Sequence, residues 1–217
     1  MSVPFSDLGA AYRELDDELA AAARRVLASG WYIGGTEVEQ LERAFAEHCD
    51  AAHCVGTGNG FDALHIALRA CDIGDGDEVI LASNSYAATV LAVSLAGATP
   101  VFVEPDAATY NIDPARIEAA ITPRTRAIMP THLYGLPADL DPIVDIANRH
   151  GLKVIEDACQ AHGASYKGRR LGAHGHAVAW SFYPTKNLGA FGDAGAVTTN
   201  DGALGARIRR TPSPRHK

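Results

Sequence analysis

The chain has 217 residues, a formal net charge of −7 and 47% hydrophobic residues, a composition that excludes a disordered, collagen-like or coiled-coil protein. Its acidic balance argues against nucleic-acid partners and against a membrane surface, because both require a positively charged face. The length predicts one large domain.

The N-terminal residues 1–7 lack the basic and apolar stretches of a signal peptide, and no apolar run is long enough to cross a bilayer. Four cysteines are scattered without CxxC spacing, so we expect no disulfide framework. They are Cys49, Cys54, Cys71 and Cys159. Together these features predict a cytoplasmic protein.

Residues 1–30 are predicted to form an N-terminal helical segment that ends near Ser29–Gly30. Its apolar side chains recur at helical spacing: Tyr12, Leu15, Leu19, Ala22 and Val26. A second helix is expected over 37–48. The periodicity of Leu64, Ala67, Leu68 and Cys71 predicts a third.

Short apolar runs then alternate with stretches of helix length. The runs are 79–81, 101–103, 127–129, 154–155, 178–182 and 196–198, and the stretches between them include 87–96, 114–121 and 140–150. Buried strands that alternate with helices predict a three-layer α/β fold with a mainly parallel sheet covered on both faces. The last run follows its neighbour so closely that it could pair with it antiparallel.

Residues 31–210 are thus predicted to form one large domain, with residues 203–210 as its last helix. Residues 211–217, Thr-Pro-Ser-Pro-Arg-His-Lys, contain two prolines and are expected to be an irregular tail.

The first candidate site is the glycine-rich stretch 56–64, which follows the short apolar pair Cys54–Val55 and opens a helix. Glycines allow close backbone approach, and the free N–H groups and dipole of a helix start favour a phosphate. The stretch is neither a dinucleotide GxGxxG motif nor a Walker P-loop. A tight turn with Asn59 as the helix cap is an equally good interpretation of these residues.

The second candidate is Asp157, at the end of the apolar strand 153–157, where an open α/β sheet binds its ligands. Its carboxylate could pair with a protonated ring nitrogen, or could simply cap the next helix. The third is Lys186, which follows the buried run 178–182 and is bracketed by Pro184 and Gly189. A solvated loop lysine is the commoner explanation for any single lysine.

The three candidates in this order indicate pyridoxal phosphate, which needs a lysine for its Schiff base, an acid for its pyridine nitrogen and an anion cradle. Lys186 and Asp157 would meet the first two needs. The amides of Gly58–Phe61 would hold the phosphate and the Ser181 hydroxyl would add a donor. Tyr86, beyond the strand 79–83, would cover the face of the ring.

A zinc site is the alternative that the histidines suggest. Cys159, His162, His174 and His176 form a loose group, but their spacing matches no standard zinc pattern. We therefore expect no metal.

Two segments, 155–163 (IEDACQAHG) and 181–189 (SFYPTKNLG), closely resemble the DegT/StrS family of sugar-nucleotide aminotransferases. Further matches lie at 30–35, 74–79, 98–101, 120–128 and 132–135, so the resemblance extends to about Arg210. It implies the large domain of a fold-type-I pyridoxal-phosphate enzyme, usually a homodimer with its active sites at the subunit interface.

The resemblance also implies roles for individual residues. Lys186 resembles the catalytic Schiff-base lysine, which also moves the proton, and it distinguishes the chain from related dehydratases that have histidine there. Asp157 resembles the partner of the pyridine nitrogen and Gln160 the residue at the ring hydroxyl. Tyr86 resembles the stacking aromatic residue and Ser181 a phosphate ligand. Asn59 and Gly60 fall in the phosphate loop.

The reaction implied by the resemblance has two halves. An amino donor, usually L-glutamate, gives its amine to the cofactor, and a nucleotide-linked keto-sugar then receives it. The pairing of residues 59–64 with 110–114 is most similar to the branch that acts on dTDP-linked 3-keto-6-deoxyhexoses, whose products serve deoxyaminosugar, polysaccharide or antibiotic biosynthesis.

Two departures from the family keep other functions open. Family members continue beyond this point with an interface loop and a small C-terminal domain, and residues 210–217 differ from the usual continuation. The chain could therefore be a catalytically silent remnant that binds cofactor or a partner. It could also be another enzyme on the same scaffold, such as a lyase or a desulfurase, although no cysteine lies in a glycine-rich exposed loop.

Overall fold

The computed structural model describes residues 7–212, which fall into two compact units divided after Leu41. Residues 1–6, most of the N-terminal stretch in which no signal peptide is expected, and residues 213–217 of the predicted tail lie outside the described residues.

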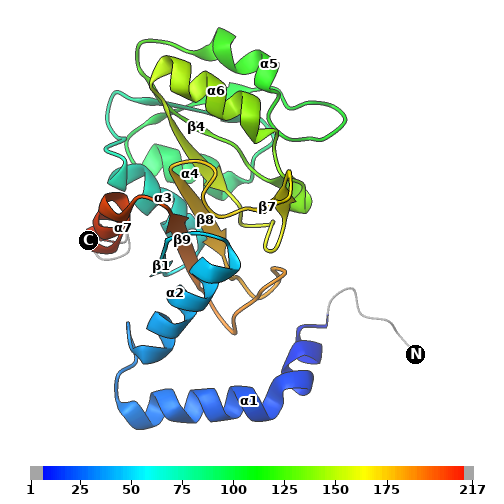
Figure 1. Ribbon diagram of the computed structural model, residues 1–217, viewed down its shortest axis with the longest axis vertical. Helices are drawn as coiled ribbons and strands as arrows, with labels where there is room; N and C mark the ends of the chain where they lie inside the picture. The colour runs from blue at the N-terminus through cyan, green and yellow to red at the C-terminus, as the bar shows by residue number, and fades with distance from the viewer. Residues whose placement is uncertain (1–6, 213–217) are drawn as a thin grey trace. The chain divides into compact units, whose positions relative to one another are not determined.

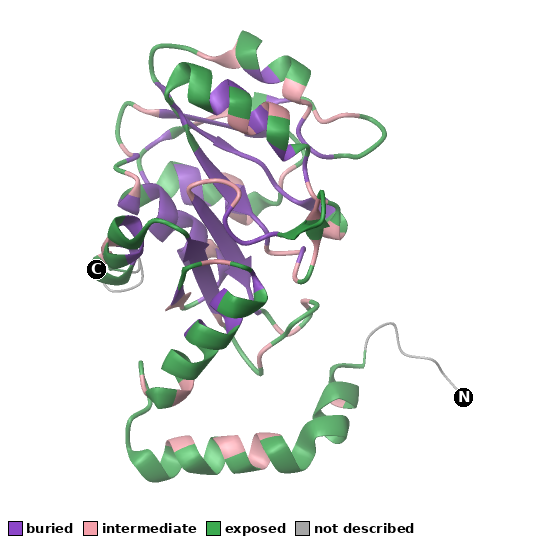
Figure 2. Cartoon of the chain, in the orientation of Figure 1, coloured by how far each residue is buried: buried purple, intermediate pink, exposed green. Residues whose placement is uncertain are grey.

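The N-terminal unit consists of α1 (Leu8–Ser29) and the first residues of α2 (Thr36–His48). Gly30 ends α1 in the left-handed conformation, at φ +67°, as expected from the Ser-Gly signal. The predicted apolar face is only partly covered, because Tyr12 is 46% exposed whereas Leu19 and Val26 are half-buried. No residue of α1 is buried (Figure 2).

A seven-stranded sheet is the centre of the second unit, with the strand order β1-β9-β8-β5-β4-β2-β3. The strands are β1 (His53–Thr57), β2 (Glu78–Ala82), β3 (Thr99–Val103), β4 (Thr125–Met129), β5 (Lys153–Asp157), β8 (Ala177–Ser181) and β9 (Gly195–Thr199). β8, β5, β4, β2 and β3 are mutually parallel, whereas β9 runs antiparallel to β1 and β8. The mainly parallel sheet confirms the prediction, and the last strand takes the antiparallel pairing that the sequence left open.

Helices cover both faces of this sheet (Figure 1). α3 (Gly60–Ala70), α4 (Ala87–Leu95) and α7 (Gly202–Arg210) contact one face, while α6 (Leu140–His150) and the short α5 (Pro114–Ile117) lie on the other. The stretch 114–121, predicted as one helix, is α5 followed by a 3₁₀ turn, η1 (Glu118–Ala120). A second 3₁₀ turn, η2 (Leu133–Gly135), follows β4.

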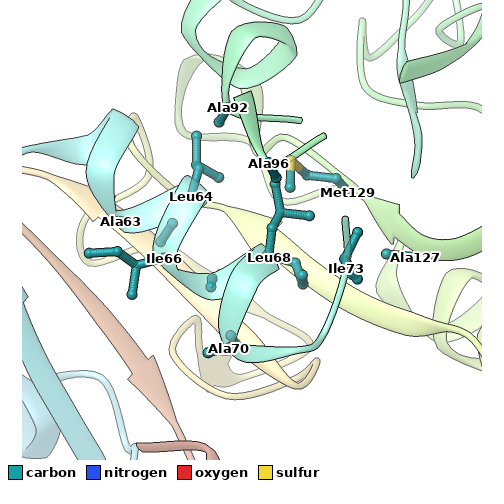
Figure 3. Close-up of a cluster of buried hydrophobic side chains, with 14 of the residues drawn as sticks. Ala63, Leu64, Ile66, Leu68, Ala70, Ile73, Ala92, Ala96, Ala127 and Met129 are labelled. Atoms are coloured by element: carbon teal, nitrogen blue, oxygen red, sulfur yellow. The ribbon is translucent and has the colours of Figure 1, made fainter. Parts of the chain in front are cut away.

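Alternate strand residues supply the two halves of the core. Val79 and Leu81 of β2 pack toward α3 and α4, whereas Ile80 and Ala82 pack toward α6. Successive side chains of a strand point to opposite faces, so continuous apolar runs are what a sheet covered on both sides requires. Leu64 and Leu68 of α3 fill the centre of the first half (Figure 3).

Three of the observed strands, β1, β6 (Ser165–Tyr166) and β7 (Arg169–Arg170), were not predicted. β1 contains only the short apolar pair Cys54–Val55, and its place in the sheet depends on pairing with β9, about 140 residues later in the chain. The two-residue strands β6 and β7 form a hairpin too short to leave a pattern. Within residues 7–212, no helix combines the length and the apolar character needed to cross a membrane.

Candidate active site

A pocket of about 460 Å³ lies where parallel strands end and their following helices begin. It is lined by the seven residues to which the family resemblance gives roles: Asn59, Gly60, Tyr86, Asp157, Gln160, Ser181 and Lys186. Gly58, which was also predicted for the phosphate cradle, is not among the lining residues. The other lining residues are Phe61, Leu64, Ala88, Thr89, Thr131, Cys159, Tyr183, Thr185 and Asp193. Asp157 and Ser181 are the last residues of β5 and β8, so the site occupies the edge at which open α/β sheets bind ligands.

The start of α3 forms one wall of this pocket. Asn59 is the helix cap, because its side-chain oxygen accepts a hydrogen bond from Asp62 N–H at 2.8 Å. The cap occupies the Asp62 N–H, and the N–H groups of Gly60 and Phe61, which have no acceptor within the helix, would face an anion at this position. A Cβ at Gly60 would lie 2.6 Å from Ser181 Cβ and 2.9 Å from Cys159 Sγ. Glycine therefore allows the helix start to approach the end of β8, and an anion held there would also meet the Ser181 hydroxyl.

Asp157 forms a second wall and is only 4% exposed. Each of its carboxylate oxygens accepts one hydrogen bond, Oδ2 from the Thr89 hydroxyl at 2.7 Å and Oδ1 from Cys159 N–H at 3.1 Å. A carboxylate has about four lone-pair positions, so it retains acceptor capacity toward the pocket. Its backbone is held by the chain after β4, where Asp157 N–H donates to Pro130 O and His132 N–H donates to Asp157 O.

Gln160 and Tyr86 lie at the rim. The side-chain oxygen of Gln160 accepts from Tyr134 N–H at 2.9 Å, which leaves its NH₂ group as a donor for a ligand. Tyr134 has φ +55°, a left-handed conformation that non-glycine residues adopt at a cost. Tyr86 precedes α4 and is 68% exposed, so its ring is available to cover a planar group.

Lys186 is half-buried in the loop that follows β8. Two backbone hydrogen bonds shape this loop, from Lys186 N–H to Tyr183 O and from Ala190 N–H to Phe182 O. The loop also closes tightly, because a Cβ at Gly189 would lie 2.5 Å from Pro184 O. The lysine is therefore on a constrained turn rather than on a solvated loop.

The pKa of the Cys159 thiol depends on the charged groups around it. Burial raises its pKa well above the usual value, the Asp157 carboxylate raises it further, and the Lys186 ammonium opposes both effects. The amine and the carboxylate therefore act on one small region of the pocket, which also offers donors for an anion. Such a site can hold a small molecule with an anionic group at one end and form a bond to the amine.

The four residues considered for the alternative zinc site do not form one cluster. Cys159 lines the pocket, His162 packs on the ring of Phe182, and His176 Nδ1 accepts from Val154 N–H at 3.1 Å. Among residues 7–212 there is no group of three or more His, Cys, Asp or Glu side chains arranged to hold a metal.

Thr89 is one of several lining residues that the sequence did not predict, and it contacts a predicted site residue directly. It lies three positions after Tyr86, and residues three apart share a face of a helix. That spacing placed Thr89 near the same pocket, but nothing in it indicated that the hydroxyl would meet a carboxylate 68 residues away.

Residues 13–213 match the DegT/DnrJ/EryC1/StrS aminotransferase family. Over 207 residues the chain is 56% identical to the dTDP-3-amino-3,4,6-trideoxy-alpha-D-glucose transaminase of Streptomyces venezuelae, covering 95% of this chain and 55% of that protein.

The fold is also similar to that of two solved structures. DesV from S. venezuelae, in complex with a ketimine intermediate, has a TM-score of 0.94 and 53% identity, over 99% of this chain and 60% of that one. NtdA from Bacillus subtilis, with bound cofactor PMP, has a TM-score of 0.89 and 37% identity, over 95% and 47%. The chain thus spans about half the length of the relatives that it matches.

Proposed function

Since the chain belongs to the DegT/DnrJ/EryC1/StrS aminotransferase family, we propose that it forms the cofactor-binding part of a pyridoxal-phosphate-dependent sugar aminotransferase. The amine would come from L-glutamate and pass to a nucleotide-linked keto-sugar. The observation that carries this proposal is the single pocket in which Lys186, Asp157 and the start of α3 converge.

The residues present fit this cofactor. The Asp157 carboxylate retains free acceptor positions for a ring N–H. The space beside Gly60, which would receive the phosphate, is open only because glycine has no Cβ. The helix start of α3 and the Ser181 hydroxyl supply donors for a phosphate. Bound pyridoxal phosphate would supply an electron sink for the substrate carbanion.

Each protein group has a separate task in the proposed reaction. Asp157 holds a proton on the pyridine nitrogen, and Gln160 donates to the ring hydroxyl. Tyr86 covers the face of the ring. Lys186 Nζ would hold the cofactor, and its amine would serve as the base that moves a proton at the substrate carbon.

The proposed substrate is a dTDP-linked 3-keto-6-deoxyhexose, with use of the aminated product in deoxyaminosugar, polysaccharide or antibiotic biosynthesis. Support comes from the name of the S. venezuelae transaminase, which is a dTDP-linked amino sugar transaminase. We further propose that residues 31–210 form the large domain, that the complete enzyme is a homodimer and that it is cytoplasmic. The four cysteines are unpaired, as expected in a reducing compartment.

The test is to add pyridoxal phosphate to the purified chain and record the visible spectrum. We expect an absorbance band that Lys186→Ala removes and that L-glutamate bleaches, and a keto-sugar nucleotide should then restore the band. A band without bleaching would indicate a silent remnant. Failure to form a band in a longer chain with the natural downstream residues would refute the assignment.

A desulfurase on the same scaffold is the second candidate. Such an enzyme needs a nucleophilic thiolate. Burial raises the pKa of Cys49 and Cys54 to about 12 and that of Cys71 to about 11, and it also raises the pKa of Cys159. All four thiols therefore stay protonated near neutral pH, which favours the aminotransferase.

A further inference from the structure

The carboxylate of Asp157 is held from two directions, and the proposed function uses neither of the groups that hold it. Cys159 N–H binds Oδ1 from the turn directly after β5. The Thr89 hydroxyl binds Oδ2 from α4, an element that follows β2 in the chain. The terminal torsion of an aspartate side chain is broad and soft, so one contact would not define the plane of the carboxylate. Two contacts from different elements do.

Thr89 is well suited to this role. It is 1% exposed and lies in the first turn of α4, where its N–H donates to Tyr86 O at 2.9 Å. A β-branched side chain has few rotamers in a helix, so little entropy is lost when the hydroxyl is fixed. The bond to Asp157 Oδ2 is 2.7 Å long and fully buried, where water competes least.

We propose that Thr89 is a positioning residue that acts through Asp157 on the ring nitrogen of the cofactor. The inference rests on the proposed function. By occupying one lone pair of Oδ2, the hydroxyl sets the plane of the carboxylate and directs the remaining lone pairs toward the pocket. Tyr86 and Thr89 lie in one helical turn, so the start of α4 would align the face of the ring and its nitrogen together.

The experiment compares two ligands that do not bond covalently to Lys186. One is pyridoxamine phosphate, and the other is its deaza analogue, in which C–H replaces the ring nitrogen. Dissociation constants are measured by calorimetry for the full chain and for Thr89→Val, which keeps the shape of the side chain and removes the hydroxyl. Thr89→Ser keeps the hydroxyl and serves as the rescue variant.

We expect the unmodified chain to prefer pyridoxamine phosphate over the analogue by about 100-fold, the range of one hydrogen bond to a charged group. Thr89→Val should reduce that preference roughly tenfold by weakening pyridoxamine phosphate alone, and Thr89→Ser should retain most of it. A structural role would instead weaken both ligands equally. Equal weakening, or an unchanged preference in Thr89→Val, would overturn the inference while leaving the proposed function intact.

A matched control is Thr198→Val. Thr198 is fully buried, and its hydroxyl donates to Gly172 O at 2.6 Å, away from the pocket. This variant should lower the melting temperature and leave the ligand preference unchanged. Should Thr89→Val fail to fold, Thr89→Ala gives the same expected loss of preference. If the unmodified chain shows no preference, Asp157 is not the partner of the ring nitrogen, and the assignment of Asp157 and the role of Thr89 both fall.

Discussion

Two neighbouring carboxylates at the end of β5, Glu156 and Asp157, lie on opposite faces of the sheet and have different hydrogen-bond partners. Glu156 points toward the α6 side, where Oε2 lies 3.0 Å from His132 Nε2 and Oε1 accepts from Gly175 N–H at 2.6 Å. His132 Nδ1 accepts from Ala138 N–H, so the ring proton is on Nε2 and points at the glutamate. Asp157 points toward α3 and α4, where one of its two partners is a hydroxyl.

From this difference we expect Glu156 to have a structural role and Asp157 a chemical one. Both oxygens of Glu156 meet N–H groups, which only donate, and the His132 and Glu156 side chains are fully buried. Asp157 faces a pocket, and its Thr89 partner can both donate and accept. Replacing the carboxylate by an amide should therefore affect mainly the reaction rate at Asp157 and mainly the free energy of unfolding at Glu156.

The largest effect should follow Asp157→Asn. The amide can accept from Cys159 N–H and donate to the Thr89 hydroxyl, so we expect the free energy of unfolding to change by less than about 1 kcal/mol. The amide cannot hold a proton on the ring nitrogen, so glutamate-dependent bleaching should slow by about 10²- to 10³-fold. Stopped-flow absorbance checks the rate. If Asp157→Asn were unstable but bleached at the unmodified rate, Asp157 would have the structural role that we assign to Glu156.

Glu156→Gln should do the opposite. An amide offers one acceptor oxygen, and its NH₂ group would face an N–H donor, so a fully buried donor is left unpaired. We expect a loss of about 3 kcal/mol in the free energy of unfolding, measured with denaturant. The bleaching rate of the folded variant should stay the same. A stable variant with slow bleaching would show that Glu156 takes part in the chemistry.

Gly60→Ala tests the Asp157 side without changing a charge. The added methyl would meet Ser181 Cβ at 2.6 Å and should push the start of α3 away from β8. We expect about 2 kcal/mol of destabilisation and a greater loss of affinity for pyridoxal phosphate than for pyridoxal, measured by spectral titration. The control is Gly192→Ala, because a Cβ added at Gly192 would have no neighbouring atom within 4 Å. An equal loss for both ligands would place the phosphate elsewhere.

The smallest effect should come from an exposed acid. The Arg149 guanidinium and His150 lower the pKa of Glu118 to about 2. Because the pKa is lower in the folded state, the stabilisation is present above the ordinary value of 4.5 and is lost as the pH falls toward 2. Glu118→Gln should therefore narrow the stability difference between pH 6 and pH 3 slightly, as followed by circular dichroism, and salt should reduce that difference. If Glu118→Gln reduced the free energy of unfolding as much as Glu156→Gln, burial would not explain the difference between the exposed and the buried acid.

Much of the fold was predictable from local patterns. The apolar runs at β2, β4 and β8 and the Ser29–Gly30 stop signal have local causes, namely burial on both faces and a left-handed helix cap. β1 was not predictable in this way, because pairing with a strand near the other end of the chain makes it a strand. The partial exposure of the apolar face of α1 was likewise not a property of its spacing.

Local rules are enough to say which chemical groups the chain carries and that Glu156 and Asp157 point to opposite faces, since side chains alternate along a strand. The tertiary structure is needed to place the pocket on one face, to bring the Thr89 hydroxyl to Asp157 and to set Gly60 against Ser181. These contacts join segments separated by 68 and 121 positions. They depend on the order of the strands in the sheet, and no local pattern encodes that order.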